Sequence, residues 1–207
     1  MEENWLHWSK KLQAISQIGR TYSQNPYDIE RYDEIEQIAL AMLSEASGLE
    51  PGQLKNLFIP PVGYVTPKVD LRAAVFNADN HILLVKEASD GLWTLPGGWA
   101  DVSEPPSLGI EREVREESGY KVKTRKLAAV LDRSEHPHEP PFPYHIYKHF
   151  FICNLIGGEA QTSHETSAVS FFPRDQIPPL SISRVLPDQI ELMFEHHLHP
   201  ELPTVYD

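Results

Sequence analysis

The 207-residue sequence predicts an α/β protein, in which a mixed sheet is layered with helices and is preceded by a small helical unit. Two observations predict this class: the first third of the chain carries apolar residues at helical spacing, and the rest alternates β-prone runs with helical stretches. A third observation separates the two parts, because the stretch between Gly48 and Lys68 contains four prolines and two further glycines. We therefore expect two domains, residues 1–65 and 66–207.

The first domain is expected to be a helical hairpin. Trp5, Trp8, Leu12 and Ile15 recur every three or four residues and share one face of the first helix. A second helix is expected to begin at Asn25-Pro26 and to end at Gly48, with an apolar stripe of Ile35, Ile38, Ala39, Met42 and Leu43. Two helices cannot bury both of their faces alone, so we expect this unit to pack on the larger domain or on a second subunit of a homodimer.

The second domain shows the alternating texture of strands and helices. The run Asn77-Ala78-Asp79-Asn80 lies between its first two β-prone runs and indicates a hairpin. The expected strands are 69–76, 81–86, 126–131, 144–155 and 168–172, and the expected helices are 105–118 and 188–197.

Composition limits the classes of partner. The chain has 18 Lys and Arg against 30 Asp and Glu, a formal charge of −12, which disfavours nonspecific attraction to nucleic acid or anionic membranes. Its one cysteine, Cys153, lies in an apolar run, so we expect a buried thiol and a reducing compartment. No apolar signal core follows the acidic start, and no run is long enough to cross a bilayer. We expect a soluble cytoplasmic protein.

The chemistry is expected on the helix over 105–118. At 100° per residue, Glu113, Glu116 and Glu117 fall within about 100° of arc on one side of the helix. Crowded carboxylates repel one another, and a cluster of hard oxygen ligands is what Mg²⁺ or Mn²⁺ requires. The ordinary alternative for neighbouring glutamates on a helix is a solvated acidic face.

The residues around these glutamates argue against a solvated face. Five residues separate Gly98 from Glu104, seven more precede the run Arg112-Glu113-Val114-Arg115-Glu116-Glu117, and Gly119 and Tyr120 complete a pattern of 23 residues. This spacing resembles the Nudix box, and the resemblance extends over residues 70–177. It departs from the family pattern at Pro105-Pro106 and at Gly109, where the family usually has alanine, and neither departure touches a ligand position.

The resemblance implies an α/β/α sandwich with a mixed sheet and a metal-dependent pyrophosphohydrolase. By this resemblance Glu113, Glu116 and Glu117 bind Mg²⁺ or Mn²⁺, with the Gly97 carbonyl as a further ligand. Other box positions are structural: Arg112 orients the acids and Glu104 braces the glycine loop and the helix, and these two join Gly98 and Gly119. Glu165, before the last strand, matches the place of a general base or an additional metal ligand, and an exposed loop acid is its equal alternative.

Substrate contacts are expected outside the box. Arg72 is the preferred partner for phosphate, because it lies in an apolar strand where an unpaired charge would be costly. Trp93, Trp99 and Tyr147 are candidates for an aromatic pocket, which could hold a quaternary ammonium or a nucleobase. Core packing is an equal alternative for each aromatic residue.

Specificity is expected from the hairpin. Its aromatic residues resemble the helical extension of a Nudix subgroup that acts on nucleoside diphosphates linked to another moiety, and the whole chain looks most similar to bacterial CDP-choline pyrophosphatases. That resemblance implies release of CMP and phosphocholine. ADP-ribose hydrolysis is one alternative. RNA processing at the same metal site is another, in which the protein acts on a short RNA either as an exoribonuclease or on the end of the RNA chain. Intact Glu113, Glu116 and Glu117 argue against a catalytically inactive binding module.

Overall fold

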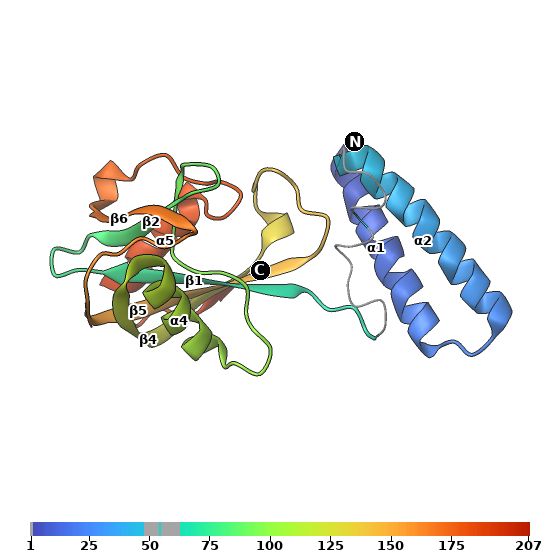
Figure 1. Cartoon of the computed structure of the whole chain (residues 1–207), viewed down its shortest axis with the longest axis horizontal. Helices are drawn as coiled ribbons and strands as arrows, with labels where there is room; N and C mark the ends of the chain where they lie inside the picture. Colours follow the sequence, from blue (N-terminus) through green and yellow to red (C-terminus); the bar gives the residue numbers. More distant parts are fainter. Residues whose placement is uncertain (1, 48–53, 55–62) are drawn as a thin grey trace. The chain divides into compact units, whose positions relative to one another are not determined.

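The computed structural model describes residues 2–47, 54 and 63–207, which divide into two compact units (Figure 1). The first unit contains residues 1–67 together with 141–145, and the second contains 68–140 and 146–207. Most of the linker expected between residues 48 and 68 lies outside the described residues. Each unit is described by itself.

The first unit is a hairpin of two long helices, as the sequence predicts. Helix α1 spans Glu2–Tyr22 and α2 spans Pro26–Ser47, and the Asn25 side chain accepts the N–H of Tyr27 at 3.0 Å where α2 begins. Ser16 Oγ donates to the carbonyl of Tyr32 at 2.6 Å. A Cβ on Gly19 would lie 2.3 Å from the ring of Tyr32, so the two helices approach closely at this glycine.

The predicted aromatic stripe of α1 does not form the contact with α2. Trp5, Trp8 and Ile15 remain 52%, 48% and 45% exposed, whereas the buried polar positions of α1 are Ser9, Gln13, Ser16 and Gln17. The buried face of α1 is therefore built mainly from small and polar side chains, whereas α2 buries the apolar Ala39, Leu40 and Leu43. This arrangement leaves the stripe available for packing outside the hairpin.

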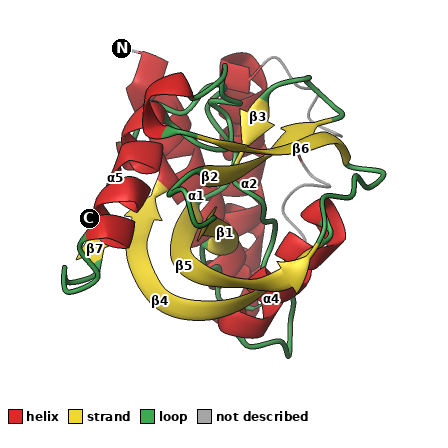
Figure 2. Ribbon diagram, turned by 90° about the vertical axis from the view of Figure 1, so that its left-hand side faces the viewer, coloured by secondary structure: helices red, strands yellow, loops and turns green. Residues whose placement is uncertain are grey.

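The second unit is built on a seven-stranded mixed sheet. Its strand order is β3-β2-β1-β5-β4-β7, and β6 pairs with β2 outside this path. β1 and β5 run parallel with Asp70 opposite Lys148, while β4 and β5 are antiparallel and strongly curved (Figure 2). The strands are β1 Lys68–Phe76, β2 Ile82–Glu87, β3 Trp93–Thr94, β4 Tyr120–Asp132, β5 Ile146–Gly158, β6 Thr166–Phe172 and β7 Val205–Tyr206.

The side chains of β1 alternate between the two faces of the sheet, so both faces carry apolar residues, and one helix covers each face. Leu71 and its alternate neighbours pack with Ile110 and Val114 of α4, which spans Pro106–Ser118. Ala74 and Phe76 belong to a second core with the apolar residues of α5, which spans Pro187–Leu198. These layers confirm the predicted fold class. Short 3-10 turns occupy Arg133–Glu135 and Arg174–Gln176.

Some element boundaries differ from the prediction. β4 begins at Tyr120, six residues before the strand expected at 126–131. Its pairing with β5 shifts register at three places, and these irregularities disrupt the alternation of apolar residues from which the strand was predicted. β3 and β7 have two residues each, too few for a periodic signal. Cys153 is buried, as expected, and burial raises the pKa of its thiol to about 12. Within the described ranges, no helix has the length and apolar character to span a membrane.

Candidate active site

A glycine loop runs along β1 and forms one wall of the site. The N–H of Leu71 donates to the carbonyl of Gly98 at 2.8 Å, and the N–H of Ala73 donates to the carbonyl of Pro96 at 2.9 Å. Gly97 has φ of +141°, and a Cβ there would lie 2.0 Å from the Leu71 carbonyl oxygen. Glycine is therefore the residue that allows the loop to approach the strand this closely.

Helix α4 presents two of the box glutamates to this loop. Pro106 lies in its first turn, and Gly119 ends it with φ of +75° and an N–H bond to the carbonyl of Arg115 at 3.0 Å. Glu117 Oε2 accepts the N–H of Gly97 at 2.8 Å. A Cβ on Gly98 would lie 3.2 Å from Glu113 Oε2. The carboxylates of Glu113 and Glu117 therefore both reach the glycine loop.

Arg112 gathers the acids on the outer side of α4. Its Nη1 lies 2.8 Å from Glu113 Oε1 and 2.9 Å from Glu116 Oε2, and its Nη2 lies 3.0 Å from Glu104 Oε2. A further contact joins Nη2 to Asp101 at 3.2 Å. These contacts suit the expected role of Arg112 in orienting the acids. The carboxylate of Glu104 acts here through Arg112, and its bracing of the glycine loop stays a prediction.

The carboxylates of the box glutamates are hard oxygen ligands of the kind that a divalent cation binds. Burial raises the pKa of Glu117 to about 8, against the opposing effects of Arg72 and the Gly97 N–H, and burial also raises the pKa of Glu113. A divalent cation would favour the charged form of such buried carboxylates. No three His, Cys, Asp or Glu side chains among the described residues are grouped to hold a metal. In this arrangement Arg112 binds Glu113 and Glu116, and the Gly97 N–H binds Glu117.

Arg72 lies in a buried ionic cluster beside these glutamates. Its Nη2 and Nε bind the two oxygens of Asp70 at 2.7 and 3.0 Å, and its Nη1 donates to the carbonyl of Leu95 at 3.2 Å. Lys148 also binds Asp70. Burial opposes ionisation of Asp70, yet Arg72 and Lys148 outweigh it and lower the pKa of Asp70 to about 2. The negative charge of Glu117 is also among the causes that raise the pKa of Arg72, so Arg72 lies near the box glutamates.

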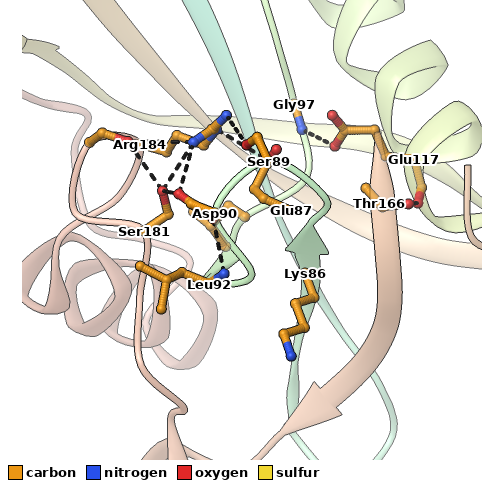
Figure 3. A network of polar contacts seen from close by, with 12 residues as sticks. Lys86, Glu87, Ser89, Asp90, Leu92, Gly97, Glu117, Thr166, Ser181 and Arg184 are labelled. Atoms are coloured by element: carbon orange, nitrogen blue, oxygen red, sulfur yellow. Dashed lines mark hydrogen bonds and ion pairs between the residues drawn. The ribbon is translucent and has the colours of Figure 1, made fainter. Parts of the chain in front are cut away.

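Glu87 is a further acid of the site that the sequence did not reveal. It ends β2, is 8% exposed, and forms an ion pair with Arg184, whose Nε lies 3.0 Å from Glu87 Oε1. Burial raises its pKa, and Arg184 and Arg72 oppose that rise. Figure 3 shows Glu87 between Arg184 and the contact of Glu117 with Gly97, while Lys86 points the other way. Its place at the end of a β-prone run is its one signal in sequence, whereas Arg184, in a distant loop, has none.

Glu165 lies in the loop before β6, close to the end of α4. Its carbonyl accepts the N–H of Ala88 at 2.8 Å, and the neighbouring Thr166 donates to the carbonyl of Glu117 at 2.7 Å. Its side chain is mostly exposed and lies 3.1 Å from His164. The loop is therefore anchored beside the box glutamates, and the role of Glu165 as base or ligand stays a prediction.

The three aromatic candidates occupy different settings. Trp93 makes an edge contact with Phe172, with 4.8 Å between the ring centroids, and packs against the core on the α5 side, which favours the core-packing interpretation. Trp99 and Tyr147 are 43% and 39% exposed and flank β1, because Trp99 bridges Asp70 while Tyr147 lies opposite Val69 on β5. The Lys68 ammonium lies 5.5 Å from the Trp99 ring centroid.

The fold and this arrangement of acids, glycine loop and buried arginine define a Nudix hydrolase, and the chain belongs to the Nudix family. The model of the NUDIX domain matches residues 66–193. Residues 3–58 match a model described as the UDP-X-like, N-terminal oligomerisation domain.

The chain is similar to several named proteins of this family. The Bacillus subtilis (strain 168) protein named "Putative ADP-ribose pyrophosphatase YjhB" is 40% identical over 207 residues, which cover 100% of this chain and 99% of that protein. The crystal structure of an ADP-ribose pyrophosphatase from Streptococcus suis 89-1591 is 40% identical, with a TM-score of 0.62, over 69% of this chain and 100% of that one. The crystal structure of a UDP-X diphosphatase is 30% identical, with a TM-score of 0.64, over 100% of this chain and 99% of that one.

Proposed function

We propose that this Nudix hydrolase cleaves the diphosphate of a nucleoside diphosphate linked to another moiety, and that ADP-ribose is its substrate, giving AMP and ribose 5-phosphate. The observation that carries the chemistry is the meeting of Glu113 and Glu117 at the Gly97-Gly98 loop, beside the buried Arg72. The choice of ADP-ribose rests on the names of the relatives from Bacillus subtilis and Streptococcus suis. These relatives favour it over CDP-choline, which the sequence resemblance had suggested.

The surroundings of the aromatic candidates also argue against choline. A quaternary ammonium group binds over open aromatic faces. Trp93 is engaged with Phe172 in the core, and the Lys68 ammonium lies near the face of Trp99, where it would repel a second cation. These two side chains therefore favour an uncharged moiety over choline.

Glu113, Glu116, Glu117 and the Gly97 carbonyl would hold the Mg²⁺ or Mn²⁺ ions. When bound, such ions neutralise charge on the phosphate oxygens and activate water for attack on phosphorus. Arg112, which binds Glu113 and Glu116, would release them to the metal while its contact with Glu104 keeps it in place.

Arg72 would stabilise the charge that develops on the diphosphate. Its side chain is fixed by two bonds to Asp70, so its orientation is set before the substrate binds. Guanidinium stays protonated at all relevant pH values and matches phosphate geometry. Glu165, on the loop beside the end of α4, would accept the proton of the attacking water.

We also propose that the chain forms a homodimer through the α1–α2 hairpin. The family model that matches residues 3–58 carries the description of an oligomerisation domain. The half-exposed Trp5, Trp8 and Ile15 provide an apolar face of the kind that subunit interfaces bury.

A substrate panel tests the proposed activity. Purified protein with Mg²⁺ or Mn²⁺ should hydrolyse ADP-ribose with a higher kcat/KM than CDP-choline, UDP-glucose or a short 5′-triphosphorylated RNA. Chelation of the metal with EDTA should stop the reaction. A preference for CDP-choline would overturn the substrate assignment, and absence of metal-dependent turnover of every compound would overturn the proposed function.

A further inference from the structure

A pocket of about 440 Å³ opens between the end of β2 and the loop before β6. Its lining residues are Glu87, Ala88, Ser89, His164, Glu165 and Arg184. Two contacts place it next to the box glutamates: Ala88 binds the carbonyl of Glu165, and Thr166, which follows Glu165, binds the carbonyl of Glu117. A substrate whose diphosphate lies at the glutamates of α4 could therefore extend one end into this pocket.

Arg184 organises the pocket wall. Its Nε lies 3.0 Å from Glu87 Oε1, its Nη2 lies 3.3 Å from Ser89 Oγ, and its Nη1 lies 3.3 Å from Asp90 Oδ2 (Figure 3). Ser181 also binds Asp90, at 2.7 Å. One guanidinium thus fixes a carboxylate and a hydroxyl of the pocket lining in defined positions.

The chemistry of the lining selects the kind of group that it can bind. The lining has two carboxylates, Glu87 and Glu165, and one guanidinium that already pairs with Glu87, so the pocket is acidic and would repel a phosphate. Carboxylates and a serine hydroxyl accept hydrogen bonds from hydroxyl groups. The one aromatic ring in the lining is the imidazole of His164, which is 89% exposed and lies 3.1 Å from Glu165, so the pocket offers no Phe, Tyr or Trp face to a nucleobase or a quaternary ammonium. An uncharged, hydroxyl-rich group fits best.

We infer that this pocket binds the vicinal diol of the moiety joined to the nucleoside diphosphate, and that Arg184 is a positioning residue that holds Glu87 and Ser89 for it. The inference rests on the proposed function, because it assumes a diphosphate at the α4 glutamates. Ribose and hexose share the diol, so both are sources of the same chemistry.

Equilibrium binding separates the diol from the rest of the substrate. The full chain, without added divalent metal, is titrated in a calorimeter with ADP-ribose, ADP-glucose and the β-methyl ester of ADP, which keeps the diol of the adenosine ribose but lacks the diol of a linked moiety. The wild type should bind at least one diol compound about tenfold more tightly than the methyl ester, the contribution expected of one or two hydrogen bonds.

Variants then assign the preference to the pocket. Arg184→Met should reduce the preference to about twofold, with little change for the methyl ester, and Ser89→Ala, a milder change, should remove part of it. Arg174→Met is the control, because Arg174 is an exposed arginine whose partners, Glu191 and Glu195, do not line the pocket. This variant should keep the wild-type preference.

Equal affinity of the wild type for the methyl ester and both diol compounds would overturn the inference. Equal weakening of all three ligands by both Arg184→Met and Ser89→Ala would also overturn it. Failure of the proposed function shows in a different measurement, since the wild type would then leave ADP-ribose uncleaved in the presence of Mg²⁺ or Mn²⁺ whatever its binding preference.

Discussion

Arg72 Nη2 lies 2.7 Å from Asp70 Oδ1 in a pair whose residues are 6% and 5% exposed, and Asp70 also binds the buried Lys148. Asp70→Ala would leave two buried cations without their carboxylate, so we expect it to lower the free energy of unfolding by about 3–5 kcal/mol. Asp101→Ala is the matched control, because Asp101 is 70% exposed in its pair with Arg112 and should contribute less than about 1 kcal/mol. Urea denaturation measures both, and equal losses would contradict the account.

Gly119 is expected to be required by space as well as by backbone conformation. Its φ is +75°, and a Cβ there would lie 2.4 Å from the carbonyl oxygen of Glu159. Gly91 has φ of +71°, and a Cβ at that position would meet nothing within 4 Å, so Gly91→Ala measures the conformational cost alone, about 1 kcal/mol. Gly119→Ala should lower the free energy of unfolding by clearly more. Similar losses in thermal or urea unfolding would show that the contact with Glu159 does not matter.

His138 should make stability depend on pH. Its Nδ1 binds the carbonyl of Ile182 at 2.8 Å and its Nε2 binds the side-chain amide of Gln189 at 3.0 Å, contacts that suit a neutral ring. Burial lowers its pKa to about 4, and the charges of Lys148 and Arg133 act in the same direction. Between that value and the ordinary pKa of about 6.5, the unfolded chain binds a proton that the folded chain does not.

The stabilising effect of the neutral His138 ring should therefore be complete above about pH 6.5 and should be lost as the pH falls toward 4. The free energy of unfolding, measured from pH 7 to pH 5, should fall more steeply for the wild type than for His138→Gln. The difference between the two slopes should correspond to the uptake of up to about one proton on unfolding. Parallel curves for the two proteins would count against this role of His138.

The exposed stripe of α1 should hold the proposed dimer together. Trp8→Lys places a charge in the apolar face, so the variant should sediment as a monomer at concentrations where the wild type is a dimer. His7→Lys is the control, since His7 is exposed on the same helix about 100° around from Trp8 and should leave the dimer intact. A monomeric wild type, or a dimeric Trp8→Lys variant, would refute the proposal.

The parts of the site that lie close in sequence could be predicted from it. The spacing of Glu113 and Glu117 places both on one side of a helix, and the structure turns that side toward Gly97 and Gly98. The helix boundaries followed from the same local signals, Pro106 at the start and Gly119 at the end. Local spacing therefore carried the centre of the site.

The surroundings of the site depend on strand order, which local patterns do not determine. Asp70 and Lys148 are 78 residues apart and meet because β1 and β5 pair in parallel. Glu87 meets Arg184 only when the loop after β6 packs against the end of β2. The Trp5 and Trp8 stripe was predicted correctly as one face of a helix, yet sequence did not indicate that the hairpin would pack through Ser16 and Gly19 instead.

The most direct test of the central claim compares Glu117→Gln with the wild type in the hydrolysis of ADP-ribose with Mg²⁺ or Mn²⁺. The amide oxygen of glutamine can still accept the Gly97 N–H, so the fold should persist while the negative charge is lost. Glu111→Gln is the matched control, because Glu111 lies on the same helix and binds the N–H of Thr124 on β4. We predict that the wild type and Glu111→Gln release AMP and ribose 5-phosphate, and that Glu117→Gln is slower by about a hundredfold or more. A Glu117→Gln variant as active as Glu111→Gln would contradict the account.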